Sequence, residues 1–227
     1  MKTFIIYGGS SELLSDFHKR NKKDKVINIY NKNQIKNKDT YNIKIDEFLK
    51  NFNELQFDKN FEFSKLIFLN VAALNYDNFL INLTKKQINN LIKVNCLNTI
   101  DIINTILPIM IKKNYGRLIN FTSFKSNFPS TGNLLYASSK SFTQTLFKGI
   151  GVEYSKFNIT SNNILIGFSK GKLFHSLQKN SKKNLLNNLS KNKTLSSSEI
   201  TNAINFLIKS NYINSSTIDL TSGIVLT

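Results

Sequence analysis

The chain has 227 residues, 41% of them hydrophobic, which is enough to bury the core of one α/β domain. Cys96 is its only cysteine, which excludes an intrachain disulfide and favours a reducing, cytoplasmic location. Two histidines, without clustered cysteines or carboxylates at ligand spacing, argue against a dedicated metal site.

The formal net charge of +17 raises the question of nucleic-acid binding, because lysine-rich surfaces attract phosphates. Lysine is abundant along the whole chain, however, and arginine, the better residue for base and phosphate contacts, occurs only as Arg20 and Arg117. We therefore expect a solvated basic surface and no specific nucleic-acid partner. We also expect no membrane partner, because polar residues interrupt the longest apolar stretches before the roughly 20 residues that a membrane span needs.

Short apolar segments alternate with longer helical segments, which is the pattern of parallel strands joined by helical crossovers. Segments 66–70 and 117–122 are nearly continuous apolar runs, as expected for central strands that helices cover on both faces. The sequence thus predicts one doubly wound α/β domain over residues 1–227, with a mostly parallel seven-stranded sheet. The predicted strands span residues 3–7, 25–30, 41–45, 66–70, 117–122, 160–166 and 217–220.

Helical periodicity places the main helices between these strands. Apolar residues at three- and four-residue spacing predict one helix over 84–113, with Thr84 as its N-cap, and a second over 134–153. A shorter helix over 199–209 is expected to be capped by Ser198. Lys, Asn and Ser dominate the preceding stretch, so we expect a substrate loop or lid around 168–197.

Four polar residues stand where a doubly wound domain binds its ligands. Tyr136 and Lys140 are four residues apart in a predicted helix and therefore share one face; alone, such a pair is a weak signal. Ser123 ends a predicted central strand, and ligands of open parallel sheets bind beyond the carboxyl ends of the strands. Asn95, among apolar neighbours, is either a surface residue or a buried amide that needs a partner. The four together are a more specific signal than any one.

With these residues the chain resembles the short-chain dehydrogenase/reductase family over nearly its whole length, including its 3-oxoacyl thioester reductases. The family's Asn, Ser, Tyr and Lys tetrad falls on Asn95, Ser123, Tyr136 and Lys140. The resemblance implies a Rossmann-like domain and an NAD(P)-dependent oxidoreductase that interconverts a carbonyl and a secondary alcohol by hydride transfer. Residues 70–73 (Asn-Val-Ala-Ala) resemble the family's Asn-x-Ala-Gly element, residues 116–123 its fifth strand, and residues 212–223 its C-terminal strand and glycine.

The resemblance also implies a role for each of the four residues. Hydride transfer to a carbonyl leaves negative charge on oxygen, so Tyr136 would supply the proton and Ser123 would bond the substrate oxygen. A free tyrosine titrates near pH 10, so Lys140 is expected to lower the pKa of Tyr136, and also to hold the nicotinamide ribose. Asn95 would hold a water that connects Lys140 to solvent.

The nucleotide-binding turn departs from the family pattern. The family's Thr-Gly-x-x-x-Gly-x-Gly corresponds to residues 7–14, where only Gly8 is retained, and Glu12 and Leu14 occupy the other glycine positions. Glycines there allow a tight bend and a close approach of backbone to pyrophosphate, so we expect weakened cofactor binding. Backbone and hydroxyl donors at the start of the following helix would compensate, from Gly9, Ser10 and Ser11.

The choice of cofactor depends on the end of the second strand. A carboxylate there would favour NAD, whereas Asn31 and Lys32 favour NADP, with Lys32 as a phosphate contact. Asp46 resembles the family's adenine-contacting Asp, although a surface carboxylate is an equally simple interpretation. The expected cofactor-binding residues are Gly8, Ser10, Ser11, Leu13, Asn31, Lys32, Asp46, Asn70, Ala72, Tyr136, Lys140 and Gly167.

Two functions remain open on the sequence. The first is an active reductase or dehydrogenase for a small carbonyl or alcohol, with an anionic or carrier-linked substrate or a sugar as options. The second is a protein of the same fold that has lost turnover and serves as a binding or assembly module, which Glu12 and Leu14 motivate. By resemblance, a homodimer or homotetramer would form through the two long helices.

Overall fold

The computed structural model describes residues 2–31, 33–35, 40–55, 63–169 and 193–223. They form a parallel sheet of seven strands in the order β3-β2-β1-β4-β5-β6-β7. The strand order reverses between β1 and β4, which makes this a doubly wound, Rossmann-like fold. Each predicted strand agrees with the structure to within one residue at either end. The strands are β1 (Thr3–Tyr7), β2 (Lys25–Tyr30), β3 (Thr40–Lys44), β4 (Leu66–Asn70), β5 (Gly116–Ser123), β6 (Ile159–Ile166) and β7 (Thr217–Leu220).

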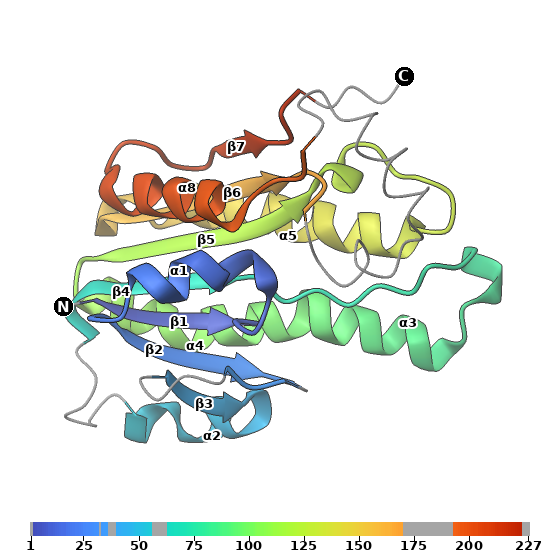
Figure 1. Ribbon diagram of the computed structural model, residues 1–227. Coiled ribbons are helices and arrows are strands. Elements are labelled where there is room, and N and C mark those ends of the chain that lie inside the picture. Colours follow the sequence, from blue (N-terminus) through green and yellow to red (C-terminus); the bar gives the residue numbers. More distant parts are fainter. Residues whose placement is uncertain (1, 32, 36–39, 56–62, 170–192, 224–227) are drawn as a thin grey trace.

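Helices cover both faces of the sheet (Figure 1), and an apolar layer lies on each face. Successive side chains of a strand point to opposite faces, so Ile5 and Tyr7 of β1 join one layer while Phe4 and Ile6 join the other. Because both faces are covered, β1 and β4 are buried along their whole length, as the apolar runs predict. The first layer is made by α2 (Ile45–Leu55), α4 (Asn98–Lys112) and α5 (Leu134–Glu153), and the second by α1 (Ser15–Arg20) and α8 (Ser197–Lys209).

The predicted helix over 84–113 is continuous but contains a wider turn. It comprises α3 (Lys85–Ile92), the π-helical η4 (Lys93–Leu97) and α4. Thr84 caps it as predicted, with a capping box in which Thr84 Oγ1 accepts from the Gln87 backbone N–H at 3.2 Å and Gln87 Oε1 accepts from the Thr84 N–H at 2.9 Å. The extra residue in the π-turn places Asn95 in the interior.

Among the described residues, this is the one helix that is long and apolar enough to cross a membrane. Its most apolar window has a mean hydropathy of 1.5, but 61% of that window is buried inside the structure. It packs between α2 and α5 in the first layer, which is the position of a core helix.

The other helices follow the sequence closely, with one correction. α5 begins and ends at the predicted residues. α8 begins earlier than expected, because Ser196, and not Ser198, is its N-cap and accepts from the Glu199 N–H at 3.2 Å. The described part of the chain also has short helical turns at η1 (Glu12–Leu14), η2 (Phe63–Lys65), η3 (Leu80–Asn82), η5 (Phe124–Ser126) and η6 (Ser155–Phe157).

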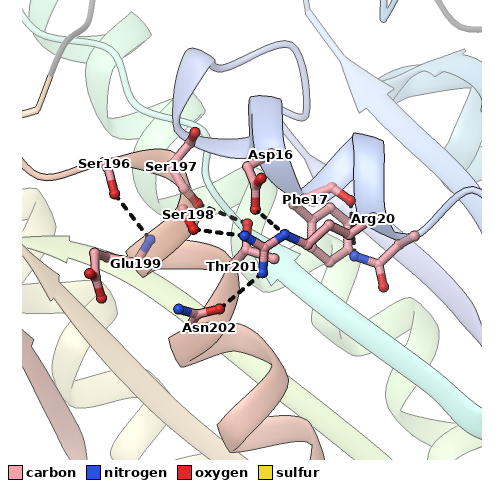
Figure 2. A network of polar contacts seen from close by, with 10 residues as sticks. Asp16, Phe17, Arg20, Ser196, Ser197, Ser198, Glu199, Thr201 and Asn202 are labelled. Carbon is pink, nitrogen blue, oxygen red and sulfur yellow. Dashed lines mark hydrogen bonds and ion pairs between the residues drawn. The ribbon is translucent and has the colours of Figure 1, made fainter.

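Helices α1 and α8 are joined by a polar network around Arg20 (Figure 2). The guanidinium pairs with Asp16 at 2.8 Å within α1 and donates to Ser198 Oγ at 2.7 Å and Asn202 Oδ1 at 3.1 Å on α8. Ser198 thus links helices and does not cap one. The other arginine, Arg117, is 2% exposed and donates to backbone carbonyls of Gly116, Asn158 and Ile208. Both arginines therefore serve internal contacts.

The predicted substrate loop or lid is described only at its two ends. Ser169 and Leu195 form a parallel bridge, and the Leu195 N–H donates to the Phe168 carbonyl at 2.8 Å. Residues 170–192 lie outside the described residues, so the loop remains a prediction.

Candidate active site

All strands of a parallel sheet end at one edge, which faces right in Figure 1. β1 and β4, which flank the reversal of strand order, bring Gly8 and Ala72 to this edge. Ser123 ends β5, and Gly167 follows β6. The exposed Asn31 and Asp46 follow β2 and β3 at the same edge, whereas Lys32 lies outside the described residues. The predicted residues thus converge on the edge where doubly wound folds bind ligands.

Tyr136 lies in the first turn of α5, and Ser123 is close enough to act on the pKa of its phenol by hydrogen bonding. Burial raises the pKa of Tyr136 above its ordinary value, and the hydrogen bond from Ser123 lowers it by less. The carboxylate of Asp77 raises it further. The net direction is opposite to the expectation that Lys140 lowers this pKa, because loss of solvent around the phenol outweighs the stabilisation of the phenolate.

Lys140 is 3% exposed, one helical turn beyond Tyr136. Its ammonium donates to the Phe121 carbonyl of β5 at 2.9 Å and to the Ala72 carbonyl after β4 at 3.4 Å. Burial lowers the pKa of Lys140 from 10.5 to about 8, against a smaller opposite effect of Cys96. A buried ammonium held by neutral carbonyls is thus close to titrating at neutral pH.

Asn95 is 2% exposed and has protein partners for its whole side-chain amide. Its Oδ1 accepts from the Leu74 N–H at 2.7 Å, and its Nδ2 donates to the Leu74 carbonyl at 2.9 Å and to Ser139 Oγ at 2.9 Å. The side chain therefore ties the segment after β4 to α5, and both of its N–H groups are used within the protein. Ser139, which the sequence analysis missed, is the residue that links Asn95 to the helix of Tyr136 and Lys140.

The turn after β1 requires glycine at position 8. Gly8 has φ +85°, and a Cβ there would lie 2.7 Å from the backbone N and Cα of Ala72. The Tyr7 carbonyl accepts from the N–H groups of Val71 and Ala72 at 2.9 and 2.8 Å. The first glycine of the family pattern therefore lets the turn lie directly against the segment that follows β4.

Leu14 does not obstruct this edge. Leu14 is fully buried in the second apolar layer with Phe4 and Phe17, while Glu12 is exposed. Ser11 caps the short η1 turn, accepting from the Leu13 N–H at 3.4 Å. The chain thus replaces the two glycines by an exposed glutamate and a core leucine, and the close approach at Gly8 and the exposed Ser10 still fit a dinucleotide at this turn.

The side chain of Asn70 is hydrogen-bonded inside the fold. It is 1% exposed, donates to Asn120 Oδ1 at 2.9 Å and accepts from Thr99 Oγ1 at 3.4 Å. Asn120 in turn donates to Asn163 Oδ1 at 2.8 Å, so three asparagines cross-link β4, β5 and β6. Single asparagines inside apolar strands were the available signal for this network.

Comparisons with known proteins agree with this geometry. A family model described as short chain dehydrogenase matches residues 60–182. The 3-oxoacyl-(acyl-carrier-protein) reductase FabG of Buchnera aphidicola subsp. Schizaphis graminum is 30% identical over 163 residues, which are 71% of this chain and 67% of the relative. The enzymes of the same name from Buchnera aphidicola subsp. Acyrthosiphon pisum and Escherichia coli are 25% and 24% identical, over 85% and 70% of this chain and 75% and 66% of the relatives. The chain therefore belongs to the short-chain dehydrogenase family and is an NAD(P)-dependent oxidoreductase.

Proposed function

We propose that this protein reduces a carbonyl substrate to a secondary alcohol with NADPH, using Tyr136 as the general acid. The observation that carries the proposal is that Tyr136 lies beside Ser123 at the carboxyl end of β5, close enough for Ser123 to act on the pKa of the phenol, with the buried Lys140 one turn away. A hydroxyl pair at that place is suited to a substrate oxygen, which needs one donor to orient it and one to protonate it.

The chemistry divides between the bound cofactor and the chain. A bound nicotinamide supplies the hydride in one direction and accepts it in the other. Ser123 hydrogen-bonds the substrate oxygen, and Tyr136 gives it the phenolic proton as negative charge develops. The raised pKa of Tyr136 keeps the phenol protonated at neutral pH, which is the form that donates a proton during reduction.

Lys140 would hold the nicotinamide ribose and replace the proton that Tyr136 gives up. Its pKa of about 8 allows the ammonium to donate near neutral pH. Asn95 acts by position, because its bonds to Leu74 and Ser139 keep the segment after β4 against α5. We assign Lys140 to the reacting groups and Asn95 to their support.

The dinucleotide would lie along the edge from the turn after β1 to the end of β6. Gly8, Ser10, Ser11 and Leu13 would approach the pyrophosphate with backbone and hydroxyl donors. By the logic of the fold, Asn31 and Lys32 would meet the adenosine ribose, because they follow β2 in the sequence, and a sequence without a carboxylate at this place favours NADP over NAD. Asp46 would contact adenine, Ala72 the ribose region and Gly167 the nicotinamide.

The substrate class follows from the relatives, which are named as 3-oxoacyl-(acyl-carrier-protein) reductases. We propose a 3-oxoacyl thioester, carrier-linked in the cell, met by a basic surface and by a loop around 168–197 that includes Lys170, Lys172, Lys179, Lys182 and Lys183. We also propose that the protein forms a homodimer or homotetramer. The buried, free Cys96 is in keeping with a cytoplasmic location.

The test measures the oxidation of NADPH through the loss of its absorbance. Three substrates that carry the same acyl chain are compared: the carrier thioester, a small thiol thioester and the corresponding simple ketone. Reduction of both thioesters in preference to the ketone would support the proposal. Turnover of the ketone alone would contradict the substrate class. If neither NADPH nor NADH binds at millimolar concentration, as measured by nicotinamide fluorescence, the non-catalytic module becomes the better account.

A further inference from the structure

The peptide groups of Gly9, next to the dinucleotide turn, are held by two side chains from other elements. The Gly9 N–H donates to Asn28 Oδ1 in β2 at 3.0 Å. The Gly9 carbonyl lies 2.9 Å from Nε2 of His18 in α1. A Cβ on residue 9 would lie 2.7 Å from Asn28 Oδ1, so the second glycine of the turn is required by the asparagine beside it.

Asn28 is fully buried in a strand whose neighbouring residues Ile27 and Ile29 are also buried. An amide in such a place costs free energy unless its polar atoms are paired. Its oxygen accepts from Gly9, and its Nδ2 donates to Asn42 Oδ1 at 2.7 Å. Asn42 is the residue directly opposite Asn28 in β3.

Asn42 is hydrogen-bonded to the segment after β2. Its Oδ1 accepts from the Ile35 N–H at 2.9 Å, and its Nδ2 donates to the Ile35 carbonyl at 3.0 Å. The side chain of Ile35 returns to the turn, because its Cδ1 lies 2.9 Å from the position of a Cβ on Gly9. Gly9, Asn28, Asn42 and Ile35 therefore form a closed ring of contacts.

We propose that Asn28 and Asn42 are positioning residues for the cofactor, which hold the turn after β1 and the segment after β2 as one rigid unit. This inference rests on the proposed function. In doubly wound folds the turn after β1 meets the pyrophosphate and the end of β2 meets the adenosine ribose. A flexible ligand binds more tightly when its two contacts on the protein are already held at the right separation, and here side-chain amides maintain that separation where two of the usual glycines are missing.

The test compares nucleotide binding by the wild type, Asn28→Ala, Asn42→Ala and the double variant. Each single substitution should raise the Kd for NADPH about tenfold, the equivalent of one buried hydrogen bond. The double variant should be little weaker than either single one, because both break the same ring. The KM for NADPH should rise in step, while kcat at saturating NADPH stays within about twofold, since the amides lie away from Tyr136.

Asn162→Ala is the matched control. Asn162 is a strand asparagine that is 1% exposed and bonded on both sides, to the Ile213 carbonyl at 2.7 Å and the Ser216 N–H at 3.0 Å, but it lies in β6. This variant should lose thermal stability as Asn28→Ala does and keep the wild-type Kd. If Asn28→Ala does not fold, Asn42→Ala on the edge strand decides alone.

The outcomes separate this inference from the proposed function. Wild type that binds neither nucleotide would end both. Wild type that binds, with unchanged Kd in Asn28→Ala or Asn42→Ala, would end the inference alone. Equal weakening by Asn162→Ala, or full additivity in the double variant, would also end it, because the effect would then be general destabilisation.

Discussion

Tyr136 and Lys140 lie on one face of α5 but differ in what burial does to them. Loss of solvent disfavours the charged form of each, so it raises the pKa of the phenol and lowers that of the ammonium. Burial therefore brings the pKa of Lys140 closer to neutral pH and moves the pKa of Tyr136 further from it. In the proposed reaction this arrangement suits a phenol that gives a proton and an ammonium that restores it.

Replacement of the phenol tests the assignment of the proton donor. Tyr136→Phe keeps the ring and removes the hydroxyl, so kcat should fall by about two to four orders of magnitude while the Kd for NADPH changes little. Tyr154→Phe, at the far end of the same helix, should keep wild-type turnover. Steady-state kinetics and fluorescence titration measure the two quantities, and an unimpaired Tyr136→Phe would remove Tyr136 from the mechanism.

The lowered pKa of Lys140 predicts a pH dependence of stability. Between about 8, its folded value, and 10.5, its ordinary value, the unfolded chain binds more protons, so the free energy of unfolding rises with pH. Relative to Lys140→Met, the wild type should gain about 2 kcal/mol between about pH 7 and about pH 9.5. Urea unfolding of both proteins at the two pH values measures this difference, in which the other titrating groups cancel. A constant difference would mean that Lys140 titrates normally.

At the scale of elements, the long helix from α3 to α4 begins with a capping box and contains a π-helical turn further along. The capping box at Thr84 satisfies backbone donors that a helix start otherwise leaves unpaired. The π-turn further along brings Asn95 inward, where its amide holds the segment after β4. The π-turn of this helix thus supports the site, whereas the capping box at Thr84 stabilises the start of the helix.

The cap can be tested without touching the site. Thr84→Ala should lower the free energy of unfolding by about 1 kcal/mol, the usual cost of losing such a cap, and leave kcat unchanged. Thr105→Ala makes the same chemical change inside α4, where the Thr105 hydroxyl only bonds the Asp101 carbonyl of its own helix. That control should be within about 0.5 kcal/mol of wild type. Equal effects of the two substitutions would argue against the capping box.

At the scale of the whole molecule, the outer face of α5 carries apolar side chains that the described fold does not cover. Leu134, Phe142 and Val152 are 49%, 43% and 69% exposed. A hollow of about 310 Å³ on the same helix is lined by Phe142, Thr145, Leu146, Gly149, Ile150 and Glu153. Such exposed apolar surface on a long helix is typical of an interface between subunits.

Charge placed on this face should therefore separate the proposed oligomer. Phe142→Asp is expected to convert a dimer or tetramer into smaller species, because an unpaired carboxylate is costly in an apolar interface. Phe206→Asp, at a 51% exposed position of α8 on the other side of the sheet, should keep the wild-type mass. Light scattering coupled to gel filtration measures both. A monomeric wild type would refute the oligomer outright.

Much of the fold could be predicted because its signals are local. Apolar runs and helical spacing located the seven strands, α5 and the capped helix at Thr84 to within a few residues. Spacing predicted that Tyr136 and Lys140 share a helix face, since residues four apart on a helix do so wherever that helix lies, whereas the tetrad as a whole was implied by the resemblance to the family. Ser198 was misassigned for the same reason, because two serines precede it and local sequence does not rank them as caps.

The remaining features depended on contacts between residues far apart in the chain. Leu14 could have obstructed the cofactor edge, and only the packing of α1 against α8 places it in the core. The ring of Gly9, Asn28, Asn42 and Ile35 requires three elements to meet, and the rise in the pKa of Tyr136 depends on everything that removes water from the phenol. Sequence by itself determined which elements form and which residues share a face, because periodicity is local. The tertiary structure alone decided the hydrogen-bond partners and the burial of the site residues, because both depend on residues that are far apart in the chain.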